Sequence, residues 1–497
     1  MSFDLGGSTH HVPAKLFVDN RRRLVAELQK LPQTAGAFVV LQGGIAKHRY
    51  NTDSEDLPFR QESYFFWTFG AHDSEAFGVI EVSTGKTAFF PPRLAADFAI
   101  WEGKINGEAF FKQKYEVEEV VFNDKYAISD YLAAHGAKNL YLLKADNTDS
   151  GNTLAPAAFK KRPEFAPTVD TTTLYPVMAN LRVFKTDLEL EVMRYAVKIA
   201  CDAHKDVMKS IHPDMYEYQC ESLFRHHSYF HGGCRHLAYT CVAATGCNSS
   251  ILHYGHANAP NSKYIKDGDM CMFDMGPEYN CYASDVTCSF PANGKFTENQ
   301  KLVYNAVLRA NREVFIAARP GVRWADMHLL AEKTLLTGLK EAGILKGDVE
   351  AMMKARLGAV FLPHGLGHLI GLDVHDVGGY LGDATPRSTE AGLSCLRTTR
   401  TLQERMMITI EPGCYFIDTV VTVAKSANLL RYHCSSSDRA LQDSKQKEFF
   451  VEEKLKEFRG MGGMRIEDVI CVWAKGNENL SHDLPRTVDE IEQFMKH

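Results

Sequence analysis

Two aspartates beside a short turn could together hold a cation. Asp274 directly follows the apolar run 270–273, and Asp285 lies a short distance further along the chain. A tight hairpin centred on Tyr279 and Asn280 would place the two aspartates directly opposite each other, with Cβ atoms about 4.5 to 5.5 Å apart. Like charges at that distance repel, so the pair needs a cation or a shared proton. Taken alone, the two residues are also compatible with an ordinary acidic turn.

A histidine-rich segment at residues 363–376 forms a second group. It reads PHGLGHLIGLDVHD and includes His364, His368 and His375. Histidines four residues apart could share a helix face, but the intervening glycines disfavour a helix, and no glutamate follows His364 to complete a zinc-protease motif. The density of imidazoles is equally compatible with a functional site and with histidines that have purely structural partners.

Two glutamates lie at or within apolar, β-prone runs, where an unpaired charge is costly to bury. They are Glu411, after the run 408–410, and Glu467, within the run 464–469. One shared cation site would explain all of these positions, with the ligands Asp274, Asp285, His368, Glu411 and Glu467. Four carboxylates carry a charge that two divalent ions neutralise. Oxygen ligands with one imidazole suit manganese, iron or cobalt better than a thiolate-type zinc site.

Other motifs carry weaker signals. His253 could supply a neutral imidazole near a reacting carbonyl, and Arg397 taken alone is typical of a surface arginine. The segment 84–87 resembles the end of a phosphate-binding loop, but Ile80 stands where its first glycine is required, which indicates a turn between strands. No Gly-x-Ser-x-Gly elbow is present to indicate a serine hydrolase.

Composition excludes several classes of protein. A chain of 497 residues predicts two or three domains. Its 56 basic and 62 acidic residues give a net charge of −6, which disfavours nucleic-acid and anionic-membrane partners. Twelve cysteines without a Cys-x-x-Cys pair indicate neither a disulfide framework nor a zinc ribbon. With no signal-peptide pattern and no membrane-length apolar run, we expect a cytoplasmic protein.

The helices and strands expected around these residues indicate an α/β (α+β) protein. Apolar strand-like runs at 37–41 and 77–82 alternate with a helical pattern at 16–31, which indicates an N-terminal α/β domain over residues 1–184. A capping box at Thr186 and Glu189 opens an amphipathic helix, and a second domain is predicted at 185–497. Within it we expect a helix beginning near Thr297, strands at 270–273, 359–362, 406–410 and 469–473, and an inserted loop with a helix at 417–457.

The order and surroundings of the five candidate ligands resemble those of the pita-bread metallopeptidases, the superfamily of methionine aminopeptidase, aminopeptidase P and prolidase. The likeness is strongest to the eukaryotic prolidases, the Xaa-Pro dipeptidases, and covers residues 12–416 and again from 458. It rests on the segments 59–63, 252–257, 361–368 and 373–380. The resemblance implies that a pita-bread catalytic domain follows the N-terminal α/β domain.

The resemblance also implies an activity, the hydrolysis of the imide bond of Xaa-Pro dipeptides by a hydroxide that bridges two manganese ions. Asp285 and Glu467 would bridge the ions, with Asp274 and His368 on opposite ions, while Glu411 would bind metal and shuttle protons to the leaving proline nitrogen. His253 and His375 would steady the substrate carbonyl and the tetrahedral intermediate, Arg397 would hold the dipeptide carboxylate, and His364 would contact substrate. A cytoplasmic homodimer that degrades collagen-derived peptides is the further implication.

Two alternatives stay open at this point. One is an Xaa-Pro aminopeptidase that accepts longer peptides. The other is a metal-free relative, either a creatinase-like amidinohydrolase or a non-catalytic binding protein. The complete ligand set disfavours the metal-free versions, because such a chain would bury four mutually repelling carboxylates.

Overall fold

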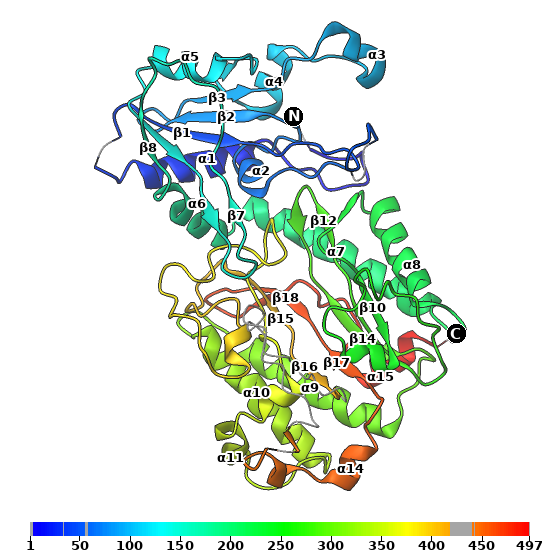
Figure 1. Ribbon diagram of the computed structural model, residues 1–497. Helices are drawn as coiled ribbons and strands as arrows, with labels where there is room; N and C mark the ends of the chain where they lie inside the picture. The colour runs from blue at the N-terminus through cyan, green and yellow to red at the C-terminus, as the bar shows by residue number, and fades with distance from the viewer. Residues whose placement is uncertain (1–2, 33, 55–57, 418–439, 442, 497) are drawn as a thin grey trace. The chain divides into compact units, whose positions relative to one another are not determined.

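The computed structural model describes residues 3–32, 34–54, 58–417, 440–441 and 443–496 (Figure 1). Its contacts divide the chain into two compact units, Met1–Val192 and Met193–His497. Both units combine helices with sheets, which confirms the expected α/β (α+β) class. The domain boundary expected at 184/185 stays a prediction.

The first unit is built on a six-stranded sheet in the order β4-β3-β2-β1-β5-β8. Strands β1/β2 and β2/β3 pair antiparallel, and the remaining pairs are parallel. The strands are β1 (Ala37–Gln42), β2 (Phe77–Glu81), β3 (Thr87–Phe90), β4 (Glu119–Val120), β5 (Asn139–Leu142) and β8 (Thr168–Asp170), with a separate pair β6 (Ala145–Asp146) and β7 (Thr153–Leu154). The helices are α1 (Lys15–Leu28), α2 (Ser63–Phe69), α3 (Ala99–Glu102), α4 (Glu108–Tyr115), α5 (Ala127–Ala134) and α6 (Leu174–Val183).

Helices cover both faces of this sheet. Phe90 belongs to the apolar cluster that contains Ile128 and Leu132 of α5. Its neighbour Phe89 contacts Phe65 of α2, with ring centroids 6.3 Å apart. Because adjacent strand residues point to opposite faces, α5 and α2 lie on opposite sides. The apolar runs predicted as strands are therefore central strands buried on both faces, and the helix expected at 16–31 is confirmed as α1.

The helix α7 (Asp187–Ser210) begins as the capping box predicts. The Thr186 backbone N–H donates to Glu189 Oε2 at 2.8 Å, and the Glu189 N–H donates to Thr186 Oγ1 at 3.2 Å. Two otherwise unpaired donors at the helix start are thereby satisfied. The same motif, with Thr297 as cap and Gln300 three residues later, opens the helix α9 (Glu298–Ala317). Both predicted helix starts are confirmed.

The second unit combines small antiparallel sheets with helices. Its sheets have the orders β10-β11-β14, β15-β18-β19, β16-β17 and β13-β12-β9. The strands are β9 (His236–Leu237), β10 (Val242–Thr245), β11 (Met270–Asp274), β12 (Pro277–Tyr279), β13 (Tyr282–Ala283), β14 (Thr287–Pro291), β15 (Met407–Ile410), β16 (Gly413–Tyr415), β17 (Gly463–Arg465), β18 (Asp468–Cys471) and β19 (Glu478–Asn479). The further helices are α8 (Glu217–Phe230), α10 (Trp324–Glu341), α11 (Val349–Lys354), α12 (Gly358–Phe361), α14 (Glu452–Lys456) and α15 (Val488–Phe494). Helix α9 packs against α10 and contacts β15, β16 and β17.

Three of the four strands expected in this unit are confirmed, as β11, β15 and β18. The expected strand at 359–362 is wrong, because that apolar run forms the helical turn α12. A short apolar run has no periodicity that distinguishes a buried strand from a buried helix. Of the loop and helix expected at 417–457, residues 418–439 and 442 lie outside the described residues, and α14 forms a helix near the end.

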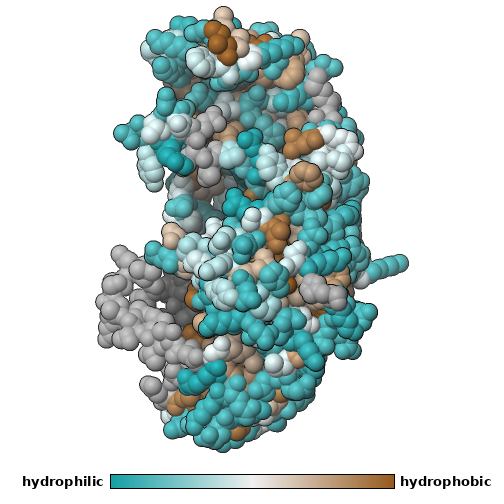
Figure 2. Space-filling view, turned by 90° about the vertical axis from the view of Figure 1, so that its right-hand side faces the viewer, coloured by the Kyte–Doolittle hydropathy of each residue, from teal (hydrophilic) through white to brown (hydrophobic). Residues whose placement is uncertain are grey.

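The face drawn in Figure 2 is mainly hydrophilic, and its hydrophobic side chains appear singly or in small groups. Such scattered apolar side chains are normal for a folded protein surface. Among the described residues, no helix combines the length and apolarity needed to cross a membrane.

Candidate active site

A cavity of about 490 Å³ in the second unit gathers all nine residues singled out in the sequence. They are His253, Asp274, Asp285, His364, His368, His375, Arg397, Glu411 and Glu467. These residues come from strand ends and loops far apart in the sequence. The structure therefore brings every one of them to a single cavity, and their individual roles stay predictions.

The hairpin that carries the two aspartates has a different register from the expected one. Asp274 pairs across the ladder with Thr287, so the prediction that Asp274 directly opposes Asp285 is wrong. The turn lies one residue later, at Asn280 and Cys281, whose φ angles are 45° and 62°. A type I′ turn requires positive φ at both central residues. The partner of Asp274 is therefore displaced by two residues along the opposite strand, from Asp285 to Thr287. Because side chains alternate with a period of two, Asp274 and Asp285 still lie on one face of the hairpin.

Three of the candidate ligands form a compact buried cluster. Ligand atoms of Asp285, His368 and Glu467 all lie within 4.8 Å of one another. His368 Nε2 is 3.2 Å from Asp285 Oδ2 and 3.4 Å from Glu411 Oε1. An imidazole nitrogen and carboxylate oxygens thus converge on one small volume, as the ligands of a metal ion do.

Neighbouring backbone and hydroxyl groups orient these ligands. Glu411 and Glu467 stand at the ends of the paired strands β15 and β18. Thr287 Oγ1 donates to Glu467 Oε2 at 2.7 Å, and the His368 backbone N–H donates to Thr409 Oγ1 at 3.0 Å. A Cβ atom at Gly367 would lie 2.0 Å from the Thr409 carbonyl oxygen, so only glycine permits this approach. Gly367, which disfavours a helix in this segment, therefore allows the backbone beside His368 to lie close to β15.

Burial and mutual repulsion favour the protonated forms of the acidic residues. Burial, followed by repulsion from Asp274, raises the pKa of Asp285. Burial raises the pKa of Glu411 to about 7, with Asp285 and Asp274 adding to the shift and His368 opposing it. The pKa of Glu467 lies well above its usual value for the same reasons. The Asp274 Oδ1 atom is buried and accepts no hydrogen bond from the described residues. Repelling carboxylates with an unsatisfied oxygen fit divalent cations.

The raised pKa of Glu411 predicts how the stability of the metal-free protein depends on pH. Folded protein holds this proton more tightly than unfolded protein, so the carboxyl contributes stability below about pH 4.5 that is lost as pH rises to about 7. Relative to Glu411→Gln, we expect the wild-type free energy of unfolding to fall over this range by on the order of 1 to 3 kcal/mol. Urea unfolding of both chelator-treated proteins from pH 4.5 to 8 measures the difference, and a pH-independent difference would contradict the assignment.

A buried cation that was not predicted from the sequence, Arg465, also lies in this cluster. Arg465 donates to Asp274 Oδ2, to the Tyr415 hydroxyl at 2.7 Å and to Thr287 Oγ1 at 3.2 Å. Its Nε also lies 4.0 Å from Glu411 Oε2. Arg465 ends the buried strand β17, so it shows the same signal, a charged residue in an apolar run, that identified Glu467. One positive charge offsets only part of the charge of four carboxylates.

The cavity also holds three further histidines that favour the neutral form. Burial, with Arg465 nearby, lowers the pKa of His364 to about 3, and its Nε2 lies 2.8 Å from the Tyr415 hydroxyl. Burial and the charge of Arg465 lower the pKa of His253. Burial, His368 and Arg397 lower that of His375, whose ring meets the His368 ring edge-on with centroids 4.5 Å apart. Neutral imidazoles can donate or accept hydrogen bonds with a substrate.

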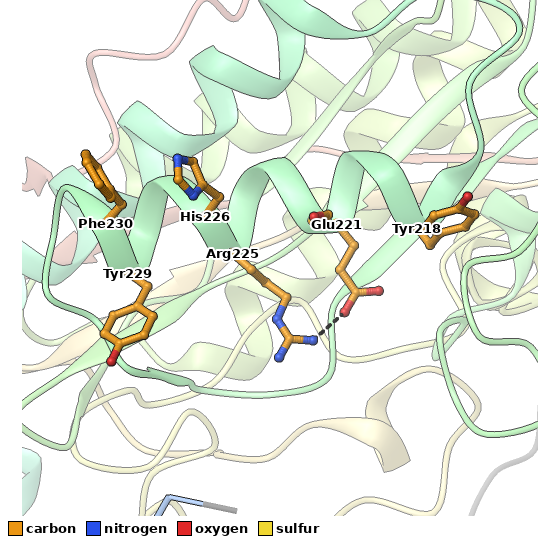
Figure 3. A pocket seen from close by; sticks show the side chains of 7 residues that line it. Tyr218, Glu221, Arg225, His226, Tyr229 and Phe230 are labelled. Atoms are coloured by element: carbon orange, nitrogen blue, oxygen red, sulfur yellow. Dashed lines mark hydrogen bonds and ion pairs between the residues drawn. The ribbon is translucent and has the colours of Figure 1, made fainter.

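A second hollow, along one face of α8, has different chemistry (Figure 3). The side chains that line it are Tyr218, Glu221, Ser222, Arg225, His226, Tyr229 and Phe230. Arg225 Nη1 donates to Glu221 Oε1 at 3.1 Å, so the one acidic group of this hollow already has a cationic partner. The hollow lacks the clustered carboxylates of the first cavity.

Two known protein families match separate parts of the chain. Residues 191–474 match metallopeptidase family M24. Residues 17–141 match the aminopeptidase P N-terminal domain. The first match covers more than half of the chain and includes the whole candidate ligand set.

Similar proteins cover nearly the full length. The chain is 49% identical to the Xaa-Pro dipeptidase of Rattus norvegicus and 50% identical to that of Homo sapiens, in each case over 99% of this chain and 96% of the relative. Among solved structures, it is similar to a zinc-substituted E. coli aminopeptidase P in complex with product, with a TM-score of 0.74 and 28% identity over 97% of this chain and 98% of that one. Pseudomonas aeruginosa aminopeptidase PepP gives a TM-score of 0.76 with 27% identity over the same shares of the two chains.

These matches confirm the family resemblance and the fold expected from the sequence, an N-terminal α/β domain followed by a pita-bread domain. The chain belongs to metallopeptidase family M24.

Proposed function

We propose that this chain is an Xaa-Pro dipeptidase, a metal-dependent hydrolase that cleaves the imide bond before a C-terminal proline. The observation that carries the proposal is the convergence of four carboxylates and one imidazole on a single cavity. Full-length relatives named Xaa-Pro dipeptidase, at about half identity, support this substrate class.

The metal centre would hold two divalent ions, which we propose to be manganese. Asp274, Asp285, His368, Glu411 and Glu467 would hold the ions. When bound, such ions acidify a water molecule and polarise the scissile carbonyl. The mainly oxygen donor set and the burial of the cluster support this assignment.

The remaining residues of the cavity would bind substrate and move its proton. Glu411 lines the cavity and would relay a proton to the proline nitrogen as the imide bond breaks. The neutral imidazoles of His253 and His375 would hydrogen-bond the substrate carbonyl oxygen. Arg397 would bind the free carboxylate of the dipeptide, and His364 would contact substrate beside Glu411.

An Xaa-Pro aminopeptidase that accepts longer peptides is the second candidate function. It is supported by the shared fold with bacterial aminopeptidase P. The identity to those structures is 27 to 28%, against 49 to 50% for the dipeptidases, and this contrast favours the dipeptidase.

The proposal is tested by measuring metal content and dipeptide cleavage together. We expect purified protein to bind two manganese ions, to hydrolyse Gly-Pro, to lose this activity after chelation and to regain it with Mn²⁺. Elemental analysis per chain and a proline-release assay provide the measurements. Full activity in metal-free protein would overturn the proposal.

The cellular setting and assembly belong to the same proposal. Eleven cysteines in the described part of the chain are free thiols, which suits the reducing cytoplasm. The family resemblance supports a homodimer and a role in degrading proline-rich peptides such as those from collagen. The capping box at Thr186 supports a catalytic domain that begins at residue 185.

A further inference from the structure

A buried histidine outside the cavity contacts the backbone of both arms of the hairpin, the segments that carry Asp274 and Asp285. His204 of α7 is fully buried, and its Nε2 lies 3.0 Å from the carbonyl oxygens of both Met275 and Val286. Because both neighbours are acceptors, Nε2 carries the hydrogen and is shared between them. Met275 directly follows Asp274, and Val286 directly follows Asp285.

The ladder between these two arms is interrupted at this level. Strand β11 ends at Asp274 and β14 begins at Thr287, whereas β12 and β13 form a separate pair. Between the two pairs, the Met275 N–H donates to the Val286 carbonyl at 3.2 Å. A Cβ atom at Gly276 would lie 2.0 Å from the Ser284 carbonyl oxygen, so the backbones are very close here. His204 therefore adds a side-chain donor where the regular strand pairing is broken.

The surroundings of His204 hold it neutral and in one orientation. Burial lowers its pKa to about 4, and its ring packs edge-on against Phe224 of α8 with centroids 5.0 Å apart. Its other nitrogen, Nδ1, is buried and has no hydrogen-bond partner among the described residues. An unsatisfied buried polar atom costs stability, which an apolar side chain at this position would avoid. The histidine is therefore explained by what Nε2 does, and not by packing.

We propose that His204 is a positioning residue that sets the separation of Asp274 and Asp285. His204 shares its single Nε2 hydrogen between the carbonyl oxygens of Met275 and Val286, the residues that directly follow the two aspartates. This shared hydrogen bond links the two hairpin strands directly beside the two carboxylates. The arms then hold both carboxylates at the spacing that a pair of divalent ions requires. This inference rests on the proposed metal centre and assigns a role to a residue that contacts neither metal nor substrate.

The test compares three variants at position 204 with a control on the same helix. His204→Leu removes the donor, His204→Gln keeps an N–H near the position of Nε2, and His204→Asn keeps an amide that is too short to reach both carbonyls. Val207→Ala removes buried apolar contacts of α7 and leaves His204 intact. Mn²⁺ affinity is measured by titration calorimetry of chelator-treated protein, together with urea unfolding of the metal-free form.

We expect His204→Leu and His204→Asn to weaken Mn²⁺ binding by about tenfold, as loss of a residue that orients metal ligands does. His204→Gln should retain most of the affinity. Val207→Ala should lower the free energy of unfolding and leave the affinity unchanged. If His204→Leu does not fold, the contrast between the Gln and Asn variants decides the same question.

Unchanged affinity in the Leu and Asn variants, with normal binding by wild type, would overturn the inference and leave the metal centre intact. Equal weakening by Val207→Ala would overturn it as well, since general destabilisation would then explain the effect. Wild-type protein that binds no Mn²⁺ would overturn the proposed metal centre together with the inference.

Discussion

Replacing Asp285 with asparagine is expected to remove bound metal and dipeptidase activity together. Asp285 belongs to the buried cluster, its Oδ2 lies 3.2 Å from His368 Nε2, and the charge of Asp274 repels it. Loss of a proposed direct metal ligand should lower metal affinity by more than the roughly 10 to 100-fold that outer partners of a metal site cost. Elemental analysis per chain and cleavage of Gly-Pro measure the two effects.

Stability separates this outcome from simple misfolding. Because burial and Asp274 raise the pKa of Asp285, the metal-free variant should be at least as stable near neutral pH as metal-free wild type. Asp267→Asn is a matched control, since Asp267 is exposed in the segment before β11 and its Oδ1 accepts a hydrogen bond that an amide oxygen can also accept. Wild-type metal content in Asp285→Asn would contradict the proposed centre.

Removing the side chain of Arg397 is expected to abolish the preference for dipeptides. A free carboxylate directly after proline exists only in an Xaa-Pro dipeptide, and a guanidinium can bind it through two hydrogen bonds. Such a charge-assisted contact contributes roughly 1.5 to 3 kcal/mol, which at about 1.4 kcal/mol per tenfold corresponds to on the order of 10 to 100-fold in kcat/KM. Arg397 lines the cavity, and its charge lowers the pKa of His375.

The measurement compares Gly-Pro, Gly-Pro-Ala and Gly-Pro-amide as substrates for wild type, Arg397→Ala and Arg397→Lys. Wild type should cleave the dipeptide well and reject the other two, and lysine should restore part of the difference as a point charge. Arg319→Ala, at an exposed arginine, controls for loss of positive charge in general. Equal cleavage of all three substrates by wild type would favour the aminopeptidase alternative.

The sequence was most informative where a residue type conflicts with its surroundings. Glu411 and Glu467 stand out because a carboxylate interrupts an apolar run, and the structure places both in the cavity. Arg465 is likewise a charged residue in an apolar run. It was not predicted as part of the site because a cation cannot be a ligand of a metal ion. His204 occupies a regular position on an apolar helix face, so only the carbonyls that it contacts distinguish it from a core residue.

Local geometry accounts for the expectations that failed. The turn at Asn280 and Cys281 contains no glycine, so the sequence does not mark which two residues adopt positive φ. The predicted pairing therefore placed Asp285 opposite Asp274, whereas the residue opposite is Thr287. The apolar run 359–362 is compatible with a strand or a helical turn until its neighbours are known, and here it forms α12.

The wide spacing of the candidate ligands has a consequence for folding kinetics. Asp274 and Glu467 stand at opposite ends of a long stretch of the chain that includes α9 to α12, and both line the cavity. Contacts this distant in sequence form late, because closing a long loop costs entropy before the contact repays it. Ions that bind only this finished arrangement would act on the native state. They would slow the unfolding of the chain without speeding its refolding.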